Sequence, residues 1–336
     1  MPISSSMSQE VATISGWRDL LDKLTGFELD DESIKVLYHD NIDNSMNSSL
    51  GRYFDEAVNS MDGVRGAHAK FPKHYSGGGH VKQKIRKELG GDPDVIINFM
   101  AGPPSGILRE FEANGTLVLN DPDMYPVTGS KVRTQQLLEQ ADVPVAETVI
   151  PHSYDDIREF CERVEGPYVL KPSNGFGGKG IRKVDTAEEA LKQVNLGTDI
   201  VQEDVFKYWP HQSFRDIRAY VVGDECIGAM YRVNNDWITN IHNGGHGEKV
   251  PDNEYQKVAE LAVEAVKAMG DGLHFSGVDI LERYDKDGNV DYIVLELNSA
   301  PGGFYNLERS TGHGRDAVRQ IVEYSVELEK EFHGGE

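Results

Sequence analysis

The chain has 336 residues, of which 38% are hydrophobic and 27% charged, and its formal charge is −22. This length allows two or three domains with their own cores, and no apolar run approaches the length of a membrane span. The negative charge argues against nonspecific binding to nucleic acid, whose phosphates it would repel. A globular protein that binds neither membrane nor nucleic acid is therefore expected.

The start of the chain and its cysteines indicate a cellular compartment. The first residues lack the basic flank and apolar core of a signal peptide. Cys161 and Cys226 are the two cysteines, too few for a disulfide framework, and a reducing environment suits them. We expect a cytoplasmic protein in which residues 1–33 are disordered or weakly ordered.

Short apolar segments alternate with helical ones in the N-terminal third. Strands are predicted at residues 34–38, 94–99 and 116–119, with helices at 50–59 and 105–113. This alternation predicts a small parallel sheet with helices on its faces. Ligands of such sheets bind beyond the carboxyl ends of the strands, so residues 39–47 and 100–105 are candidates for substrate contact.

A basic, glycine-rich segment runs from Lys70 through Arg86 to Gly91 in this otherwise acidic chain. One interpretation is a loop followed by the exposed face of a helix. The other is an arm that contacts an anionic substrate.

The middle of the chain contains a glycine loop between two predicted strands. A helix carrying Lys131 is predicted from Thr128 to Gln140, and helices at 154–164 and 186–194 alternate with strands at 145–150, 168–172, 181–184 and 199–205. Gly175 to Gly180 reads G-F-G-G-K-G and joins two strands, whereas a dinucleotide fingerprint opens a helix. A Walker loop is excluded because Gly180 follows Lys179. We predict a flap whose backbone amides wrap phosphates, with Lys171 beside it.

The last third is predicted to contain two hairpins and two long helices. The first hairpin joins strands 216–222 and 225–233 across Gly223-Asp224, and the helices span 253–269 and 315–331. Residues 206–214 are aromatic-rich and predicted to be irregular, and residues 242–247 are predicted to form a glycine-rich loop.

The second hairpin, residues 275–299, carries a candidate metal site. A two-residue loop at Asp287-Gly288 places Asp279 directly opposite Glu296, and Asn298 lies on the same face as Glu296. Opposed carboxylates repel each other, and two carboxylates with an amide oxygen suit Mg²⁺. The alternative is a solvated outer face of the hairpin.

Seven segments in one order resemble the ATP-grasp superfamily, most closely its RimK-type carboxylate–amine (alpha-L-glutamate) ligases. They lie between Ser130 and Glu323 and read S-K-V-R-T-Q-Q-L-L, V-L-K-P-S-N-G-F-G-G-K-G-I, I-V-Q-E-D-V, D-I-R-A-Y-V-V-G-D, I-T-N-I-H-N-G-G, F-S-G-V-D-I-L and L-E-L-N-S-A-P-G. The resemblance implies an ATP-grasp fold, of mixed α/β and α+β class, with an N-terminal parallel α/β (pre-ATP-grasp) domain. The implied boundaries are a substrate domain at 34–127, a small lobe with the flap at 128–204, and a C-terminal lobe with the Mg²⁺ site at 205–332.

The resemblance also implies roles for individual residues. The implied nucleotide-binding residues are Lys131 and Lys171 on the phosphates, Gly175, Gly177, Gly178 and Gly180 in the flap, Gln202, Glu203 and Val205 at the adenine hinge, Asp216 at the ribose, and Asn240 facing the nucleotide. The implied metal ligands are Asp279, Glu296 and Asn298, and the implied catalytic residues near the transferred phosphoryl group are Arg218 and Arg232.

The activity implied by the resemblance is an ATP-dependent ligation with Mg²⁺, or Mn²⁺ in its place. A carboxylate of a small molecule or peptide forms an acylphosphate, and an amine or amino acid then forms an amide, with release of ADP and phosphate. A homo-oligomer is compatible with the family. The family usually has R-S-N where this chain has Ile238-Thr239-Asn240, and often has Arg where this chain has Asn243. The resemblance therefore does not extend to glutamate as the added amino acid.

Two other functions remain open at this point. One is a peptide-modifying enzyme of the same superfamily that forms lactam or ester crosslinks, with the segment from Lys70 to Arg86 as its peptide site. The other is a nucleotide sensor with a degenerate catalytic site, against which the intact set of Asp279, Glu296 and Asn298 argues.

Overall fold

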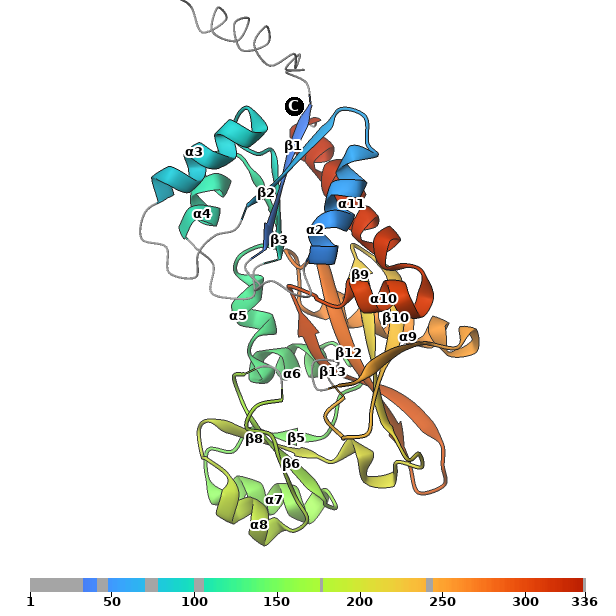
Figure 1. Ribbon diagram of the computed structural model, residues 1–336. Coiled ribbons are helices and arrows are strands. Elements are labelled where there is room, and N and C mark those ends of the chain that lie inside the picture. The colour runs from blue at the N-terminus through green and yellow to red at the C-terminus, as the bar shows by residue number, and fades with distance from the viewer. Residues whose placement is uncertain are drawn as a thin grey trace, which may run out of the picture.

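The strands of the described residues form three β-sheets that follow one another along the molecule (Figure 1). The computed structural model describes residues 33–40, 48–69, 78–99, 106–175, 178–239 and 244–334. The prediction for the first 32 residues, and the sites predicted at Gly177 and Asn240, lie outside the described residues. None of the helices that the structure describes has the length and apolarity needed to cross a bilayer.

The N-terminal sheet is parallel, with strand order β2-β1-β3-β4, as the predicted alternation of strands and helices requires. Its elements are β1 (Ile34–Asp40), α2 (Ser48–Asn59), β2 (Val64–Ala69), α3 (Gly78–Leu89), β3 (Val95–Phe99), α4 (Gly106–Glu112) and β4 (Leu117–Leu119). The prediction missed β2, whose sequence V-R-G-A-H-A is short of apolar residues because it is an edge strand with one neighbour. The segment from Gly78 onward within the basic stretch forms α3.

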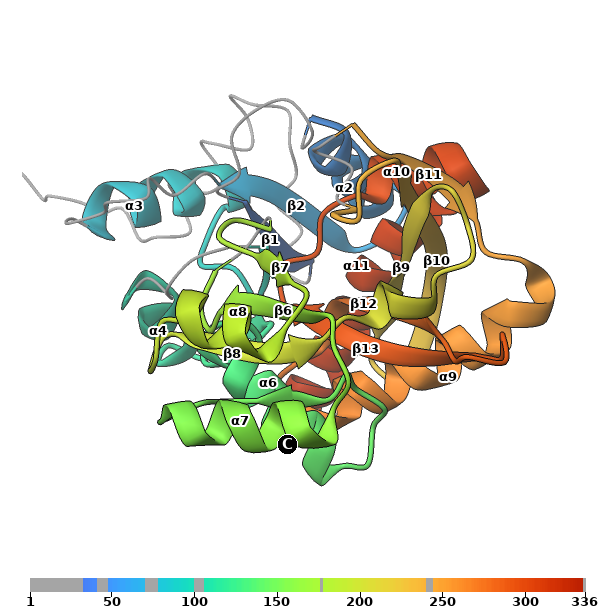
Figure 2. The same ribbon diagram turned by 90° about the horizontal axis from the view of Figure 1, so that it is seen from below.

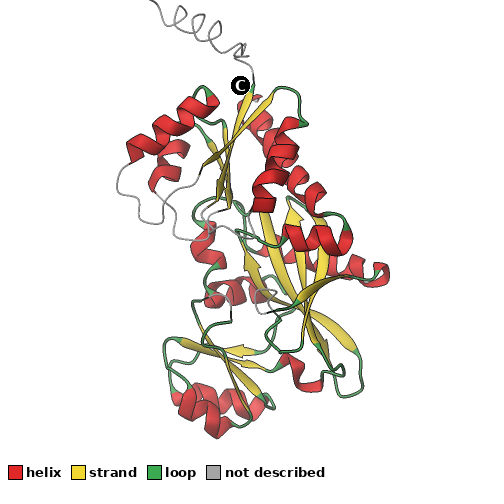
Figure 3. Ribbon diagram, in the orientation of Figure 1, coloured by secondary structure: helices red, strands yellow, loops and turns green. Residues whose placement is uncertain are grey.

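The second sheet, the lowest of the three in Figure 3, is antiparallel, and the glycine loop joins two of its strands. Its strands, in the order β5-β8-β6-β7, are β5 (Thr148–Val149), β6 (Tyr168–Pro172), β7 (Arg182–Val184) and β8 (Asp199–Glu203). The helices of this region are α5 (Met124–Thr128), α6 (Lys131–Gln140), α7 (Tyr154–Arg163) and α8 (Ala187–Gln193). The glycine loop joins β6 to β7, so the predicted strand–loop–strand arrangement is confirmed.

Alternation along these strands gives the second sheet two different faces. Leu170 and Val201 pack against α7 and α8, which cover one face (Figure 2). Val169, Lys171 and Gln202 point to the opposite face, because neighbouring residues of a strand alternate sides. That second face forms one wall of the candidate site.

The third sheet is antiparallel, with strand order β11-β10-β9-β12-β13. Its strands are β9 (Phe214–Val222), β10 (Glu225–Asn234), β11 (His246–Lys249), β12 (Phe275–Tyr284) and β13 (Val290–Asn298), and the surrounding helices are the 3₁₀ helix η1 (Val205–Tyr208), α9 (Asp252–Ala268), α10 (Phe304–Thr311) and α11 (Gly314–Gly334). The loop prediction for residues 242–247 is wrong from His246 onward, because His246–Lys249 pairs with β10 as a polar edge strand.

The hairpin β12–β13 places Asp279 opposite Glu296, as predicted, but its turn and its register differ from the prediction. The loop has three residues rather than two: the Asp285 amide donates to the Asn289 carbonyl at 3.0 Å, and Gly288 takes a left-handed φ of +84°. This turn alone would shift the register by one residue. A bulge at Leu295, between the pairs Asp279–Glu296 and Ile280–Val294, shifts it back. The two deviations cancel at the carboxylates.

One hydrophobic core joins the N-terminal sheet to the third sheet. Val36 and Ile97 of the parallel sheet share it with Val318 and Ile321 of α11. Helix α11 lies along α2 on one face of that sheet, while α3 and α4 cover the other (Figure 1). The third sheet buries its opposite face under α9, through residues such as Ala219. The part of the third sheet that α10 and α11 leave uncovered is where the site lies.

Candidate active site

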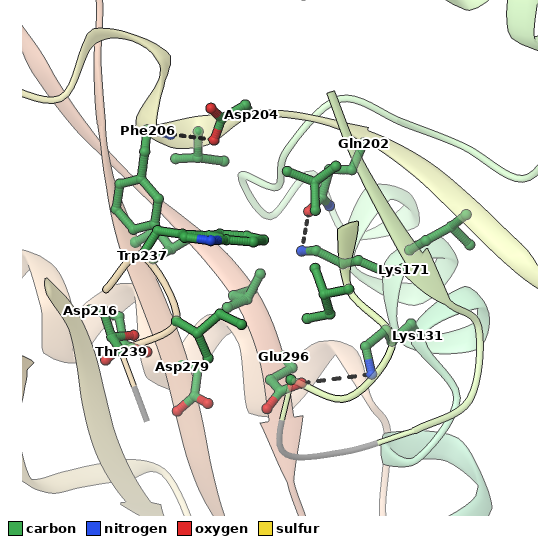
Figure 4. Close-up of a pocket in the computed structure, with 18 of the residues that line it drawn as sticks. Lys131, Lys171, Gln202, Asp204, Phe206, Asp216, Trp237, Thr239, Asp279 and Glu296 are labelled. Carbon is green, nitrogen blue, oxygen red and sulfur yellow. Dashed lines mark hydrogen bonds and ion pairs between the residues drawn. The ribbon is translucent and has the colours of Figure 1, made fainter. Parts of the chain in front are cut away.

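A cleft between the second and third sheets brings together most of the residues predicted for the site (Figure 4). Those that line it are Lys131, Lys171, Gly175, Gly178, Gln202, Glu203, Val205, Asp216, Arg232, Asp279 and Glu296. Arg218 does not line the cleft but contacts Asp279, and Asn298 is two residues beyond Glu296 on β13. Gly180 is in the turn of the flap, next to the lining residues Lys179 and Ile181.

The charged residues of the third sheet share one face because of strand alternation. On β9, Asp216 and Arg218 are on the same side as Tyr220 and Val222, whose side chains belong to the core under α10 and α11. The face therefore changes along the strand from apolar, where helices cover it, to charged, where the cleft begins. Arg232 on β10 is directly opposite Asp216 in the register.

Four buried charges on three neighbouring strands form a continuous chain of ion pairs. Arg218 binds Asp279 with two N–H groups, of which Nη2 is 3.0 Å from Oδ2. Arg232 donates from Nε to Asp216 Oδ1 at 2.8 Å, and its Nη2 is 2.9 Å from Asp279 Oδ2. Burial alone would raise the pKa of Asp279, but the two guanidinium groups outweigh burial and hold that pKa below its usual range.

Glu296 has a different environment from the carboxylate opposite it. Desolvation of the Glu296 carboxylate in the cleft, and secondly the negative charge of Asp279, raise the pKa of Glu296. Its nearest cation is Lys131, whose Nζ is 4.0 Å from Oε2 and also donates to the Gly175 carbonyl at 2.7 Å. The side chain is 35% exposed and opens into the cleft. Glu296 is therefore the accessible carboxylate of the pair.

Lys171 points from the second sheet into the cleft, with its ammonium group buried against Gln202 (Figure 4). The Gln202 amide is fixed from the other side, since its Nε2 donates to Thr148 Oγ1 at 2.9 Å. Burial is the main reason that the pKa of Lys171 is lowered to about 8; the negative charge of Glu296 opposes this shift, and the positive charge of Lys131 adds to it. The cleft thus holds a cation that an anionic ligand would stabilise.

The residues that sequence reasoning missed are mainly apolar and occupy the other end of the cleft. They include Val169 and Ile200 from the second sheet, Leu281 and Leu295 from the third, and Phe206 and Trp237 from connecting segments. The Trp237 indole projects into the cleft between Phe206 and Asp279, toward Lys171 (Figure 4). Alternation from Asp279 could have found Leu281. Leu295 faces the cleft at the bulge, for which the sequence has no local signal.

The donor set at the hairpin fits a divalent cation held jointly with phosphates. No cluster of three or more His, Cys, Asp or Glu side chains suited to a metal occurs in the described ranges. Asp279, Glu296 and Asn298 instead offer two carboxylates and one amide, all with hard oxygen donors. Mg²⁺ is typically bound by one or two carboxylates together with substrate phosphates rather than by a complete protein cage.

Two lobes clamping a cleft with lysines on one wall and a carboxylate hairpin on the other define the ATP-grasp class of ligase folds. Comparison with known structures agrees. The ATP-grasp ligase PsnB, complexed with a minimal precursor, aligns with a TM-score of 0.58 at 18% identity, covering 87% of this chain and 99% of that one. D-alanine–D-alanine ligase from Bacillus anthracis aligns with a TM-score of 0.55 at 13% identity, covering 89% and 99%.

Sequence comparison narrows the class to a family. Residues 128–324 match the RimK-like ATP-grasp domain. The tetrahydromethanopterin:alpha-L-glutamate ligase of Methanococcus maripaludis is 32% identical over 231 residues, 67% of this chain and 74% of that protein. A probable alpha-L-glutamate ligase of Chromohalobacter salexigens is 33% identical over 226 residues, 65% and 70% of the two chains. The chain belongs to the RimK-like ATP-grasp family of ligases.

Proposed function

We propose that the protein joins a carboxylate to an amine at the expense of ATP, through an acylphosphate. The observation that carries this proposal is the division of one cleft into an apolar end and a charged end. The charged end has two lysines on one wall, and Arg232, Asp279 and Glu296 on the other. Such a cleft suits a ligand with a flat apolar base and a polyphosphate.

The nucleotide is proposed to lie with its base at the apolar end, between Ile200 and Leu295 and beside the hinge formed by Gln202, Glu203 and Val205. The amides of Glu203 and Asp204 already donate to the Glu147 and Pro167 carbonyls, at 2.9 and 3.0 Å. The Val205 amide is therefore the proposed donor to the base.

The polyphosphate would extend toward the charged end of the cleft. Its proposed contacts are Lys131, Lys171 and the flap glycines Gly175, Gly177, Gly178 and Gly180, with Asp216 at the ribose and Asn240 near the nucleotide. Although both oxygens of Asp216 accept from Arg232, each keeps a second lone pair for a hydroxyl.

The chemistry follows from charge stabilisation. The substrate carboxylate attacks the γ-phosphorus and ADP leaves, while Arg218, Arg232 and the lysines neutralise the developing charge. The amine then attacks the acyl carbon, loses a proton and expels phosphate, which forms the amide. When bound, Mg²⁺ or Mn²⁺ would be held by Asp279, Glu296 and Asn298 and would supply further positive charge at the phosphates.

The substrates are proposed only as classes: a carboxylate of a small molecule or peptide, and an amine or amino acid. The curated relatives are named for the addition of glutamate. The described part of the basic segment gives little support to a peptide arm, since Lys82 pairs with Glu110, and Arg86 binds Asp92 at 2.6 and 2.9 Å. We therefore favour the ligase over the crosslinking enzyme.

The test is ADP release by the purified protein with ATP and Mg²⁺. Pools of amino acids and small peptides are supplied as acceptors, with Glu296→Ala as the control. We expect release that depends on one pool and disappears in the variant, and mass spectrometry of that pool then identifies the product. Tight ATP binding without release in any pool would contradict a small-molecule ligase and favour a macromolecular acceptor or the sensor.

A further inference from the structure

The Asp279 carboxylate is already engaged by two arginines before any ligand arrives. Its Oδ1 accepts from Arg218, and its Oδ2 accepts from Arg218 at 3.0 Å and forms an ion pair with Arg232 Nη2 at 2.9 Å. These contacts use about three of the roughly four lone-pair directions of a carboxylate. Asp279 is 1% exposed, so water does not compete for it.

The charges around this carboxylate also balance. Arg218 and Arg232 offset Asp279 and Asp216, and Lys131 is 4.0 Å from Glu296. A free divalent cation would therefore meet no net negative charge, and it would have to approach two guanidinium groups at close range. Of the hairpin pair Asp279 and Glu296, Glu296 is the one exposed to the cleft, and single carboxylates bind Mg²⁺ weakly.

A polyphosphate changes this balance. Guanidinium groups bind phosphate oxygens as readily as carboxylate oxygens, often with two N–H groups at once. Phosphates at the charged end of the cleft would thus offer Arg218 and Arg232 an alternative partner and free lone pairs of Asp279.

We propose that Arg218 and Arg232 block the metal site by occupying Asp279. The site becomes available to a metal only when nucleotide phosphates bind these arginines in place of Asp279. This proposal rests on the proposed function, because it takes Asp279 and Glu296 as the metal-binding pair. It deepens that function by assigning an order: the site rejects free divalent cations and accepts the metal with the nucleotide.

The test is binding of Mn²⁺ alone to the full chain, followed by electron paramagnetic resonance of the free ion, with no acceptor and no turnover. We expect the unaltered protein to bind Mn²⁺ more weakly than about 1 mM. Arg218→Met should tighten this binding at least roughly tenfold, because it frees Asp279 and removes a positive charge. Adding Glu296→Ala to that variant should abolish the gain, which places the gained binding at the hairpin.

Arg215→Met is the matched control. Arg215 is on the same strand and binds the buried carboxylate Glu282 with Nε and Nη2 at 2.6 and 2.8 Å, but it does not line the cleft. This change alters the net charge of the protein equally and should leave Mn²⁺ affinity unchanged. If Arg218→Met does not fold, Arg218→Lys retains the charge but loses the two-pronged contact, and should tighten Mn²⁺ binding by a smaller factor.

Unchanged or weaker Mn²⁺ binding in a folded Arg218 variant would overturn the proposal, as would submillimolar binding by the unaltered protein without nucleotide. ADP, added in a second series, should strengthen Mn²⁺ binding by the unaltered protein more than by Arg218→Met. Because this measurement needs no product, its failure is distinct from a failure to find ligase activity.

Discussion

Lys171 is the cation of the cleft whose charge depends most on pH near neutrality. Burial lowers its pKa to about 8 from an ordinary value of 10.5. The free energy of unfolding rises as pH increases between these two values, because the unfolded chain keeps a proton that the folded protein has lost. Nucleotide affinity changes in the opposite direction and falls as pH increases, because phosphates bind the protonated form of Lys171.

We predict that binding of ADP weakens as pH rises through 8 and is accompanied by proton uptake at pH 8.5. Calorimetry in buffers of different ionisation enthalpy measures this uptake. Lys171→Arg keeps its charge over this range and should show neither effect, although its affinity can differ. Equal proton uptake by both proteins would assign the titration to another group.

The charged residues of the site were easier to predict from the sequence than the apolar ones. Asp279 and Glu296 were predictable because charges on otherwise apolar strands are conspicuous, whereas Arg232 was implied only by the family resemblance. Trp237 was not, since it belongs to an irregular segment whose direction depends on tertiary packing. The roles of these residues remain proposals.

Strand β12 has a glycine, Gly277, at the point where the side chain of Arg218 from β9 passes close to it. A Cβ added at Gly277 would lie 3.1 Å from both Cδ and Nη1 of Arg218, and 3.0 Å from Cβ of Pro301. The absence of a side chain at Gly277 therefore gives the guanidinium room to reach Asp279. Sequence alone marked this glycine only as part of the F-S-G-V-D-I-L segment.

Gly277→Ala should displace Arg218 by a few tenths of an ångström and lower kcat by roughly tenfold, because small misplacements of charge-stabilising groups are costly. Gly51→Ala is the control, as a Cβ at Gly51 has nothing within 4 Å. Steady-state kinetics and urea unfolding are measured on both variants. A normal kcat in Gly277→Ala would show that Arg218 tolerates the shift.

The hairpin illustrates why elements are easier to predict than their registers. The strand segments of β12 and β13 were evident from their apolar residues, and the opposed pair was correct. The turn length was wrong and the bulge was unforeseen, because both depend on how the strands fit the rest of the sheet. The predicted pair Asp279–Glu296 was still correct because the two errors shift the register in opposite directions and cancel.

For the molecule as a whole, Asn120 joins the N-terminal region to the hairpin. Its Nδ2 donates to the Phe275 and Ser299 carbonyls, both at 2.7 Å. Its Oδ1 accepts from the amides of His274 and Phe275, at 2.6 and 2.9 Å. The side chain is 2% exposed, and Ser299 directly follows Asn298. One amide thus fixes the base of the hairpin that carries the predicted metal ligands.

Asn120→Ala should lower the free energy of unfolding by about 3 kcal/mol or more, since it leaves several buried backbone groups unpaired at about 1–3 kcal/mol each. Asn114→Ala is the control: its Nδ2 donates to the Glu110 carbonyl at 2.7 Å in an exposed setting, and its loss should cost less than about 0.5 kcal/mol. Urea denaturation compares the two. Equal, small losses would mean that water replaces Asn120.

The fold class and the order of its parts could be predicted from the sequence, because motifs and alternation are local signals. The contacts between parts could not. Nothing in the sequence near residue 120 or in the predicted helix at 315–331 indicates which distant element it meets, since such packing depends on the shape of the assembled core.

The placement of α11 has a consequence during protein synthesis. Val36 and Ile97 leave the ribosome before Val318 and Ile321, which together with α2 cover that face of the sheet and follow 221 (318 − 97) to 285 (321 − 36) residues later. At typical elongation rates of roughly 5–20 residues per second, the part of the face that α11 covers stays uncovered for about 10–60 s. During that interval it is a ready binding surface for chaperones that act on nascent chains.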